Sequence, residues 1–512
     1  MRKLNLHPII FCIIPVITLI PVTIQILSDI HTGGLNILYS FFQASINPSL
    51  EKSIIKNAFN GIFITSAVGF ISWILSCLFG IILGVLSSKF ISKKILNKEF
   101  YAYIVKTLLS IPRSMHELIW GLLLIQFFGL NPWIAILAIL IPYSSLVAKV
   151  ISDQLDILDD KYFFACKTTG ANNLISLLTT LTPKVYTTVR IYCGYRLECA
   201  LRGATILGIF GLGGIGNNLI LTLKSLQFQE MWTNLWILWF TLIIFEKVFS
   251  KTNNNLNRIS IYSIPIITLI IASIIWLNYL GFELLTSVSV KGINLPSLID
   301  IQKAFYELNI YKLIYETLLI TFLASGIAIG LPILVSLVWP NFITTEIASI
   351  CLSLLRLFPA PLTALLIILC TNPSISVASL ALGLQNVGVM GRLLSENIKN
   401  QNKTYYKAMT SFVAGNKVSN LYGILTMQAK SYLSYAAYRS EMILRETALV
   451  GVVGGIGLGW QLQESLSSFD WPQVTLVIIC YIVLIIIGEN ISGKFSNHWI
   501  MKRSESINLH HK

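Results

Sequence analysis

The chain has 512 residues, of which 55% are hydrophobic and 12% are charged, and its mean hydropathy is +0.73. A soluble domain carries about 25% charged residues, so this composition excludes a soluble globule, and it is far too apolar for a disordered chain. The formal net charge of +14 raises the question of a nucleic-acid partner, but the charges stand between long apolar runs and not on one polar face. The composition therefore predicts an all-α, polytopic membrane protein.

Twelve apolar stretches have about the 20 residues that a helix needs to cross a bilayer. The first stretch lacks the short core and the cleavage site of a signal peptide, so we expect it to stay in the protein. The predicted spans, six to each half, are 8–28, 61–87, 107–129, 132–152, 185–206, 231–249, 261–281, 313–338, 347–371, 374–394, 430–450 and 472–490. We predict a first repeat at 1–250, a linker at 251–260, a second repeat at 261–500 and a tail at 501–512.

Lysine and arginine gather in alternate loops, which indicates the orientation of the chain. The two longer loops on the opposite side, 29–60 and 282–312, carry no net charge, and one loop on the basic side, 340–346, has no Lys or Arg. The bias predicts that both termini are cytoplasmic, and it assigns the positive charge to topology and anionic lipid, not to nucleic acid. The eight cysteines form no CxxC pair, so we expect apolar filler and no metal site.

The chain repeats itself with an offset of 243 residues. The run Tyr195–Arg202 is matched by Tyr438–Arg445 at five of eight positions. Glycines continue the match, and a gap of two residues then aligns Gly214-Ile-Gly216 with Gly455-Ile-Gly457. Six spans are an even number, so both repeats share one orientation. Two like halves around a central path are typical of a transporter, whereas an enzyme rarely needs such duplication.

A segment between the fourth and fifth spans is predicted to form a short cytoplasmic helix-turn-helix. Phe164–Thr168 can make one helical turn, Gly170 permits a tight turn, Leu174–Leu181 has helical apolar spacing, and Pro183 then stops the helix. An amphipathic surface connector is the simpler interpretation. The segment recurs in the second half at Tyr406–Gly415, and this recurrence favours docking to another protein.

These segments resemble the coupling loop of ABC-importer permeases, and more specifically the phosphonate/phosphite permease family. The run from Arg113 to Trp120 is similar to that family's Arg-Ser-x-x-Glu-Leu-x-Trp motif, and Arg356 opens its counterpart, where Ala360 replaces the Glu. No Glu precedes the first coupling loop, and the second has no Pro at its end. The coupling residues that carry the resemblance are Ala165, Thr169, Gly170, Ala171, Pro183, Ala408 and Gly415.

The resemblance implies the permease of a bacterial inner-membrane importer for phosphonate, phosphite or a related oxyanion. It implies that a periplasmic binding protein delivers the substrate and that separate cytoplasmic ATPase subunits bind ATP and Mg²⁺, so this chain needs no cofactor of its own and is not an enzyme. Its glycine turns lack the Gly-Lys-Ser/Thr of a Walker A loop, and we expect them to serve close packing and bends. These glycines are Gly211, Gly213, Gly214, Gly216, Gly454, Gly455 and Gly457.

Charged residues inside the spans allow two interpretations. Glu198 with Arg202, and Glu441 with Arg445, are four residues apart and can pair on one helix face; pairing offsets the cost of about 2.5–3.5 kcal/mol for a charge in the bilayer. The pairs either fix the helices or give the path a positive field for an anion. The alternative function is an ion-coupled secondary transporter that uses the buried glutamates. The candidate residues are Arg113, Glu117, Glu198, Arg202, Arg356, Glu441 and Arg445.

Overall fold

The computed structural model describes residues 9–95, 100–129, 132–157, 161–176, 179, 182–254, 296–339, 345–400, 425–454 and 456–508. Every named element among these residues is a helix, which confirms the all-α prediction. The chain divides into two compact units. We call residues 41–294 the first unit, and residues 295–512 together with 1–40 the second unit.

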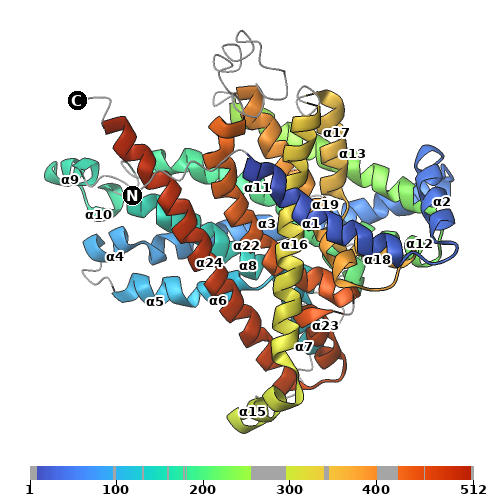
Figure 1. Ribbon diagram of the computed structural model, residues 1–512. Coiled ribbons are helices and arrows are strands. Elements are labelled where there is room, and N and C mark those ends of the chain that lie inside the picture. Colours follow the sequence, from blue (N-terminus) through green and yellow to red (C-terminus); the bar gives the residue numbers. More distant parts are fainter. Residues whose placement is uncertain are drawn as a thin grey trace. The chain divides into compact units, whose positions relative to one another are not determined.

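The helices are shown in Figure 1, and α2 (Gly34–Ile46) crosses the boundary between the units. The first unit contains α3 (Lys52–Ser87), α4 (Lys89–Ile95), α5 (Phe100–Leu108), α6 (Ser110–Ser114), α7 (Glu117–Phe128), α8 (Pro132–Ile157), α9 (Lys161–Thr168), α10 (Asn173–Ser176), α11 (Thr182–Leu207), the π-helix η2 (Gly208–Leu212), α12 (Ile215–Lys224) and α13 (Phe228–Asn254). The second contains α1 (Ile9–Ser28), α15 (Leu298–Glu307), α16 (Ile310–Val338), α17 (Glu346–Leu357), α18 (Ala360–Ile368), α19 (Ile375–Asn400), α22 (Thr426–Gly454), α23 (Gly457–Ser467) and α24 (Trp471–Asn508).

Five of the described helices, α3, α8, α16, α19 and α24, are long and apolar enough to cross a membrane, and the number rises to eight if each bent helix pair is one span. Nine of the twelve predicted spans coincide with one described helix each, and the span predicted at 261–281 lies outside the described residues. The other two, 107–129 and 347–371, are each bent in the middle, by 86° and 83°. The expectation of one straight helix there is wrong.

Both bends arise where two consecutive residues leave the helical conformation. Before α7 these residues are Met115 and His116, with ψ of 142° and 149°, and the His116 ring accepts the Leu118 amide hydrogen at 3.2 Å. Before α18 they are Phe358 and Pro359, with ψ of 113° and 136°. The proline ring disfavours helix at the residue before it. Each bend lies within a stretch long enough to be predicted as one span, although Arg113, His116 and Glu117 interrupt the apolar run at the first bend.

Small residues bring α3 and α8 together in the first unit. A Cβ atom on Gly80 would lie 2.6 Å from the Cβ of Val147, and one on Gly84 would lie 2.8 Å from that of Ile151. Only glycine therefore allows this approach of two apolar helices.

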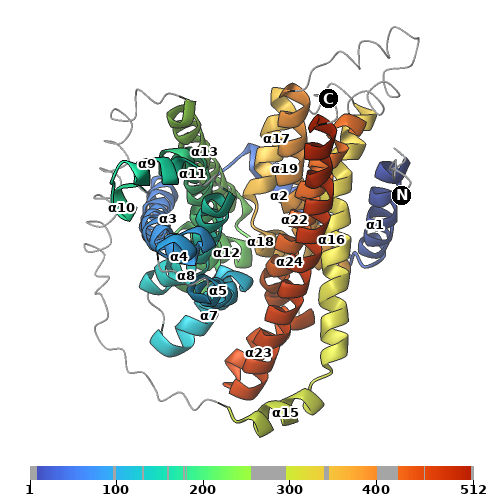
Figure 2. The same cartoon turned by 90° about the vertical axis from the view of Figure 1, so that its left-hand side faces the viewer.

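The N-terminal helix α1 packs in the second unit, along α16 and α19 (Figure 2). Val22 is fully buried there, and the Ser376 hydroxyl donates to the Gln25 side-chain oxygen at 2.5 Å. Any side chain on Gly326 of α16 would collide with Thr18. The first predicted span of the chain is thus a structural part of the unit built mainly from residues 295–512.

The repeat in the sequence is also a repeat of helices. The pairs α7/α18, α8/α19, α11/α22, α12/α23 and α13/α24 begin within one residue of the offset of 243. Even the rare positive φ of a non-glycine residue recurs, at Leu226 (58°) and Phe469 (59°). The two units therefore share one order of helices over this range.

The glycine turns are held by one threonine in each unit. In the first unit the Ile215 amide donates to the Thr65 hydroxyl at 2.9 Å, and Gly214, with φ of +81°, lies against the same threonine. In the second unit the Leu458 amide donates to the Thr317 hydroxyl at 3.0 Å. These bonds satisfy an amide that has no partner inside its own helix, because it lies in the first turn.

This contact shows how the two glycine runs correspond. Gly457, with φ of +72°, lies against Thr317 as Gly214 lies against Thr65. The runs therefore keep the offset of 243, and the predicted two-residue gap, which placed Gly455 opposite Gly214, is wrong. Gly216 corresponds to Gly459, which the sequence prediction missed.

Candidate functional site

The predicted coupling segment of the first half forms a helix, a turn and a second short helix. The helix α9 ends where the Thr168 hydroxyl donates to the Ala165 carbonyl at 2.8 Å, and the Thr169 hydroxyl donates to the Cys166 carbonyl at 2.7 Å. Gly170 follows with φ of +86°, as expected for a tight turn, and leads to α10. Ala165, Thr169 and Gly170 are exposed and Ala171 is half-buried, whereas the predicted second-half residues, Ala408 and Gly415, lie outside the described residues.

Pro183 has a different place from the one predicted. It lies in the first turn of α11, which begins at Thr182. Proline suits this position, because its fixed φ is helical and the missing N–H would have no partner there. The residue therefore starts the helix that carries the Glu–Arg pair, and the prediction that it ends the preceding helix is replaced.

One aromatic side chain anchors α9 to the body of the first unit. Phe163 is 1% exposed, and its ring meets the edge of the Phe90 ring of α4 at 5.5 Å between centroids. Ile151 and Leu155 of α8 complete the same apolar cluster. The next residue, Phe164, is 42% exposed. Burial of Phe163 therefore fixes α9 while the following residues remain accessible on its surface.

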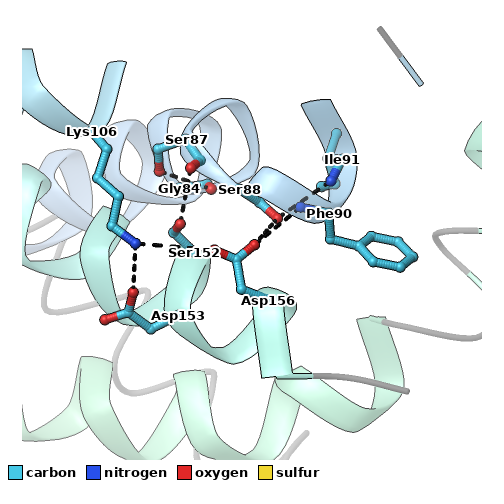
Figure 3. Close-up of polar contacts among 9 residues, drawn as sticks. All are labelled: Gly84, Ser87, Ser88, Phe90, Ile91, Lys106, Ser152, Asp153 and Asp156. Atoms are coloured by element: carbon cyan, nitrogen blue, oxygen red, sulfur yellow. Dashed lines mark hydrogen bonds and ion pairs between the residues drawn. The ribbon is translucent and has the colours of Figure 1, made fainter. Parts of the chain in front are cut away.

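A carboxylate of α8 holds the start of α4, the helix that carries Phe90 (Figure 3). Asp156, near the end of α8, accepts the Ser88 hydroxyl hydrogen at 2.8 Å and the Phe90 amide hydrogen at 3.1 Å. The Phe90 amide lies in the first turn of α4, where a carboxylate both caps free N–H groups and meets the positive end of the helix dipole. Asp156 thus fixes the start of α4, whose Phe90 packs on α9.

Three further contacts join α3, α5 and α8 at the same place. The Lys106 ammonium of α5 lies 2.9 Å from Asp153 and 4.0 Å from Asp156, and the Ser152 hydroxyl donates to the Ser87 carbonyl at 3.0 Å (Figure 3). None of these residues was predicted to be functional from the sequence. They are 47 to 68 positions apart in the pairs that they form, so no local motif marks them.

The two Glu–Arg pairs form as the spacing of four predicts. Arg202 donates to Glu198 on α11, and Arg445 donates to Glu441 on α22. The side chains of the first pair are about one-fifth exposed, whereas those of the second pair are 5–6% exposed. Each pair is electrically neutral as a unit, which supports the interpretation that it fixes its helix.

Arg113 and Glu117 stand on either side of the first bend, and both are buried. Glu117 lies 3.3 Å from the His116 ring nitrogen and 3.4 Å from the Tyr143 hydroxyl of α8. Arg356 has the matching place before the second bend and is half-buried. The structure thus brings Glu117 to the junction of α7 and α8, away from the coupling segment.

A second buried cluster contains residues that the sequence prediction missed. Arg439 of α22 donates to Glu446 at 2.9 Å and also to the Asn386 side-chain oxygen of α19, and Asn386 donates to Glu446 at 2.9 Å. At the matching position of the first unit, Arg196 lies over the Tyr143 ring at 5.3 Å. The Tyr-Arg dipeptide of the repeat was the available signal, because both arginines follow its tyrosine.

Comparison with known proteins gives several relatives, all of them transport permeases. A protein of Stutzerimonas stutzeri named as a phosphite transport system permease is 28% identical over 155 residues, which are 30% of this chain and 59% of the relative. A phosphate-import permease protein of Mycolicibacterium smegmatis is 20% identical over 431 residues, covering 78% of this chain and 77% of the relative. A second phosphite transport permease of S. stutzeri is 23% identical over 189 residues, 36% of this chain and 69% of the relative.

No family model and no solved structure matches the chain. The match to the first relative spans about three-fifths of that protein's length. The apolar helices and the relatives together indicate a multi-pass inner-membrane protein. The resemblance predicted from the sequence is confirmed: the chain is related to the permeases of phosphite, phosphonate and phosphate transport systems, and it is long enough to cover about two permease units.

Proposed function

We propose that this chain is the membrane component of an ABC importer that moves a phosphonate- or phosphite-like oxyanion into the cytoplasm. The relatives are named for phosphite and phosphate transport. In this proposal twelve spans form two tandem six-helix repeats, both termini are cytoplasmic, and a periplasmic binding protein delivers the oxyanion. Separate ATPase subunits bind ATP and Mg²⁺, and this chain carries out no chemical reaction.

The observation that carries the proposal is the anchored coupling segment. An exposed α9 and Gly170 turn present a surface for a partner, while the buried Phe163 connects the same helix to α4 and α8. A partner that moves α9 therefore also moves α4 and α8, which are packed against it.

The alternative is an ion-coupled transporter, which needs buried carboxylates that are available to an ion. In the described part of the chain, Glu198, Glu441 and Glu446 each bond to an arginine, whereas Glu117 contacts the His116 ring and the Tyr143 hydroxyl. Among the described residues, no group of three or more His, Cys, Asp or Glu residues could hold a metal ion. These pairings favour the ATP-driven function. They also support a structural role for the pairs over a bare positive field along the path.

The test uses the full chain with its binding protein and ATPase in proteoliposomes. Gly170→Trp strains the left-handed turn by about 1–2 kcal/mol and adds bulk on the docking surface; we expect it to reduce copurification of the ATPase and ATP-driven phosphite uptake at least tenfold. Leu298→Trp, at an 85% exposed position of α15, is the control for added bulk and leaves copurification of the ATPase unchanged. Undiminished ATPase association in Gly170→Trp, or phosphite uptake that stops when proton and sodium gradients are collapsed while ATP remains, overturns the proposal.

A further inference from the structure

The repeat offset reveals an exchange of buried residues between the two units. Glu117, the first residue of α7, corresponds to Ala360, the first residue of α18. Gly203 of α11 corresponds to Glu446 of α22, again 243 positions later. The first unit has a glutamate on the bent helix α7 and a glycine on the long helix α11. The second unit has an uncharged alanine on the bent helix α18 and a glutamate on the long helix α22.

In the first unit the structure places the two positions next to each other. In the first unit a Cβ atom on Gly203 would lie 3.2 Å from a carboxylate oxygen of Glu117. A side chain at position 203 would therefore enter the space that Glu117 fills from the opposite helix.

In the second unit the two positions meet around α19. The Ala360 amide donates to the Gln385 side chain at 2.9 Å, and the adjacent Asn386 donates to Glu446 at 2.9 Å. Ala360 is fully buried and Glu446 is 7% exposed. The carboxylate thus reaches the same three-helix junction in both units, from α7 in one and from α22 in the other.

The groups around each carboxylate also correspond. Tyr143 and Asn386 occupy one repeat position; the Tyr143 hydroxyl lies 3.4 Å from Glu117, and Asn386 bonds to Glu446. Arg196 and Arg439 occupy another; Arg196 lies over the Tyr143 ring at 5.3 Å and donates to the Tyr192 hydroxyl at 2.5 and 2.8 Å, whereas Arg439 bonds directly to Glu446 at 2.9 Å. Both arginines are at most 7% exposed.

We propose that each unit needs one carboxylate at this junction to position its buried arginine, and that Glu117 and Glu446 are equivalent positioning residues supplied by different helices. Arginine keeps its charge in proteins, so a buried arginine without a carboxylate nearby is costly, and two carboxylates in one such space repel each other. One carboxylate for each junction satisfies both conditions, whichever helix carries it.

The two bends are therefore held by different contacts. In the first unit the carboxylate belongs to the bend itself, so its contact with the Tyr143 hydroxyl ties the start of α7 to α8. In the second unit Arg439 and Glu446 lie on one helix, and the start of α18 is held by the neutral bond from Ala360 to Gln385. Loss of Glu117 should therefore loosen a bend, whereas loss of Glu446 should loosen the packing of α22 on α19.

The experiment moves the carboxylate from one helix to the other. In the second unit the variants are Glu446→Gly, Ala360→Glu and the double variant Ala360→Glu/Glu446→Gly; in the first unit they are Glu117→Ala, Gly203→Glu and Glu117→Ala/Gly203→Glu. The matched controls, Ala360→Gln/Glu446→Gly and Glu117→Ala/Gly203→Gln, restore the volume without the charge.

The first readout is the yield and thermal unfolding of the full chain in detergent, which does not depend on the proposed function. Each single variant should lower the yield of monodisperse protein by about tenfold, the carboxylate-transfer doubles should regain most of it, and the glutamine controls should not. The second readout, ATP-driven phosphite uptake, rests on the proposed function and should follow the same order. Doubles that are no better than the glutamine controls, or singles that lose nothing, overturn the proposal even if phosphite is not the substrate.

Discussion

The substitution Asp156→Ala tests whether α4 connects the coupling segment to the body of the first unit. It removes the acceptor of the Ser88 hydroxyl and of the Phe90 amide, at 2.8 and 3.1 Å. Hydrogen bonds to a charged group contribute about 1.5–3 kcal/mol each when intact. The Asp156 side chain is 19% exposed, so water replaces part of the loss.

A second contribution partly offsets this cost. Asp156 lies in the last turn of α8, where a negative charge opposes the helix dipole by about 0.3–1 kcal/mol. We therefore expect Asp156→Ala to destabilise the docking of α4 by about 2 kcal/mol, or roughly 30-fold in the local opening equilibrium. The loss should extend to α9, because Phe90 supplies the ring against which Phe163 packs.

The assay is hydrogen exchange of the full chain in detergent, read on peptides from α4 and α9. Asp153→Ala is the matched control: its carboxylate is 42% exposed and is 2.9 Å from the same Lys106, and such surface pairs contribute about 0–1 kcal/mol. Equal exchange in the two variants would refute the capping argument. Faster exchange in α4 with unchanged exchange in α9 would refute the connection through Phe90.

Three further predictions concern packing. Thr65→Val leaves the buried Ile215 amide without the hydroxyl that now lies at 2.9 Å, and it should lower the free energy of unfolding by about 1–3 kcal/mol in a thermal-unfolding assay. The control Thr321→Val loses a bond only within its own helix, so its unfolding temperature should change little. Gly216→Ala would press on the Thr205 carbonyl and should abolish folded protein, whereas Gly213→Ala meets no atom and should cost about 1–2 kcal/mol through its φ of +87° alone; equal yields would contradict this. Gly326→Val should displace α1 from α16 because of Thr18, with increased proteolysis of α1 as the measurement; protection equal to that of the unaltered chain would contradict the packing.

Long apolar helices were predictable from the sequence because burial in lipid is a property of composition. The predicted spans 61–87 and 313–338 correspond to α3 and α16 with matching C-terminal ends. The bends were not predicted from hydropathy, because the span pattern counts apolar stretches of the right length; the largely polar run from Arg113 to Glu117 was the available signal at the first bend. At the second bend Pro359 gave a local signal, and the proline rule would have found it.

The coupling segment, too, was predictable only in part. Its helix, turn and second helix follow from local rules, and Gly170 has the positive φ that its turn requires. The contacts that anchor it do not follow from local rules, because the Phe90 amide and the Asp156 carboxylate that it bonds to are 66 positions apart in the sequence. The sequence repeat correctly aligns arginines 196 and 439. It placed the second glycine run two residues out of register, because two Gly-Ile-Gly sequences can match by chance. The threonine contact in the structure identifies the residues that truly correspond.

Fusion of two units in one chain makes the carboxylate exchange possible. When two identical subunits assemble, every substitution appears twice, so a glutamate lost at the bend is lost from both halves at once. In this chain Ala360 and Glu446 differ from Glu117 and Gly203 within one molecule, and each half can be balanced separately. The Glu–Arg pair is also more deeply buried in the second unit than in the first. The shared helix order therefore preserves one backbone plan, while the buried polar groups give the two halves different local constraints at their bends.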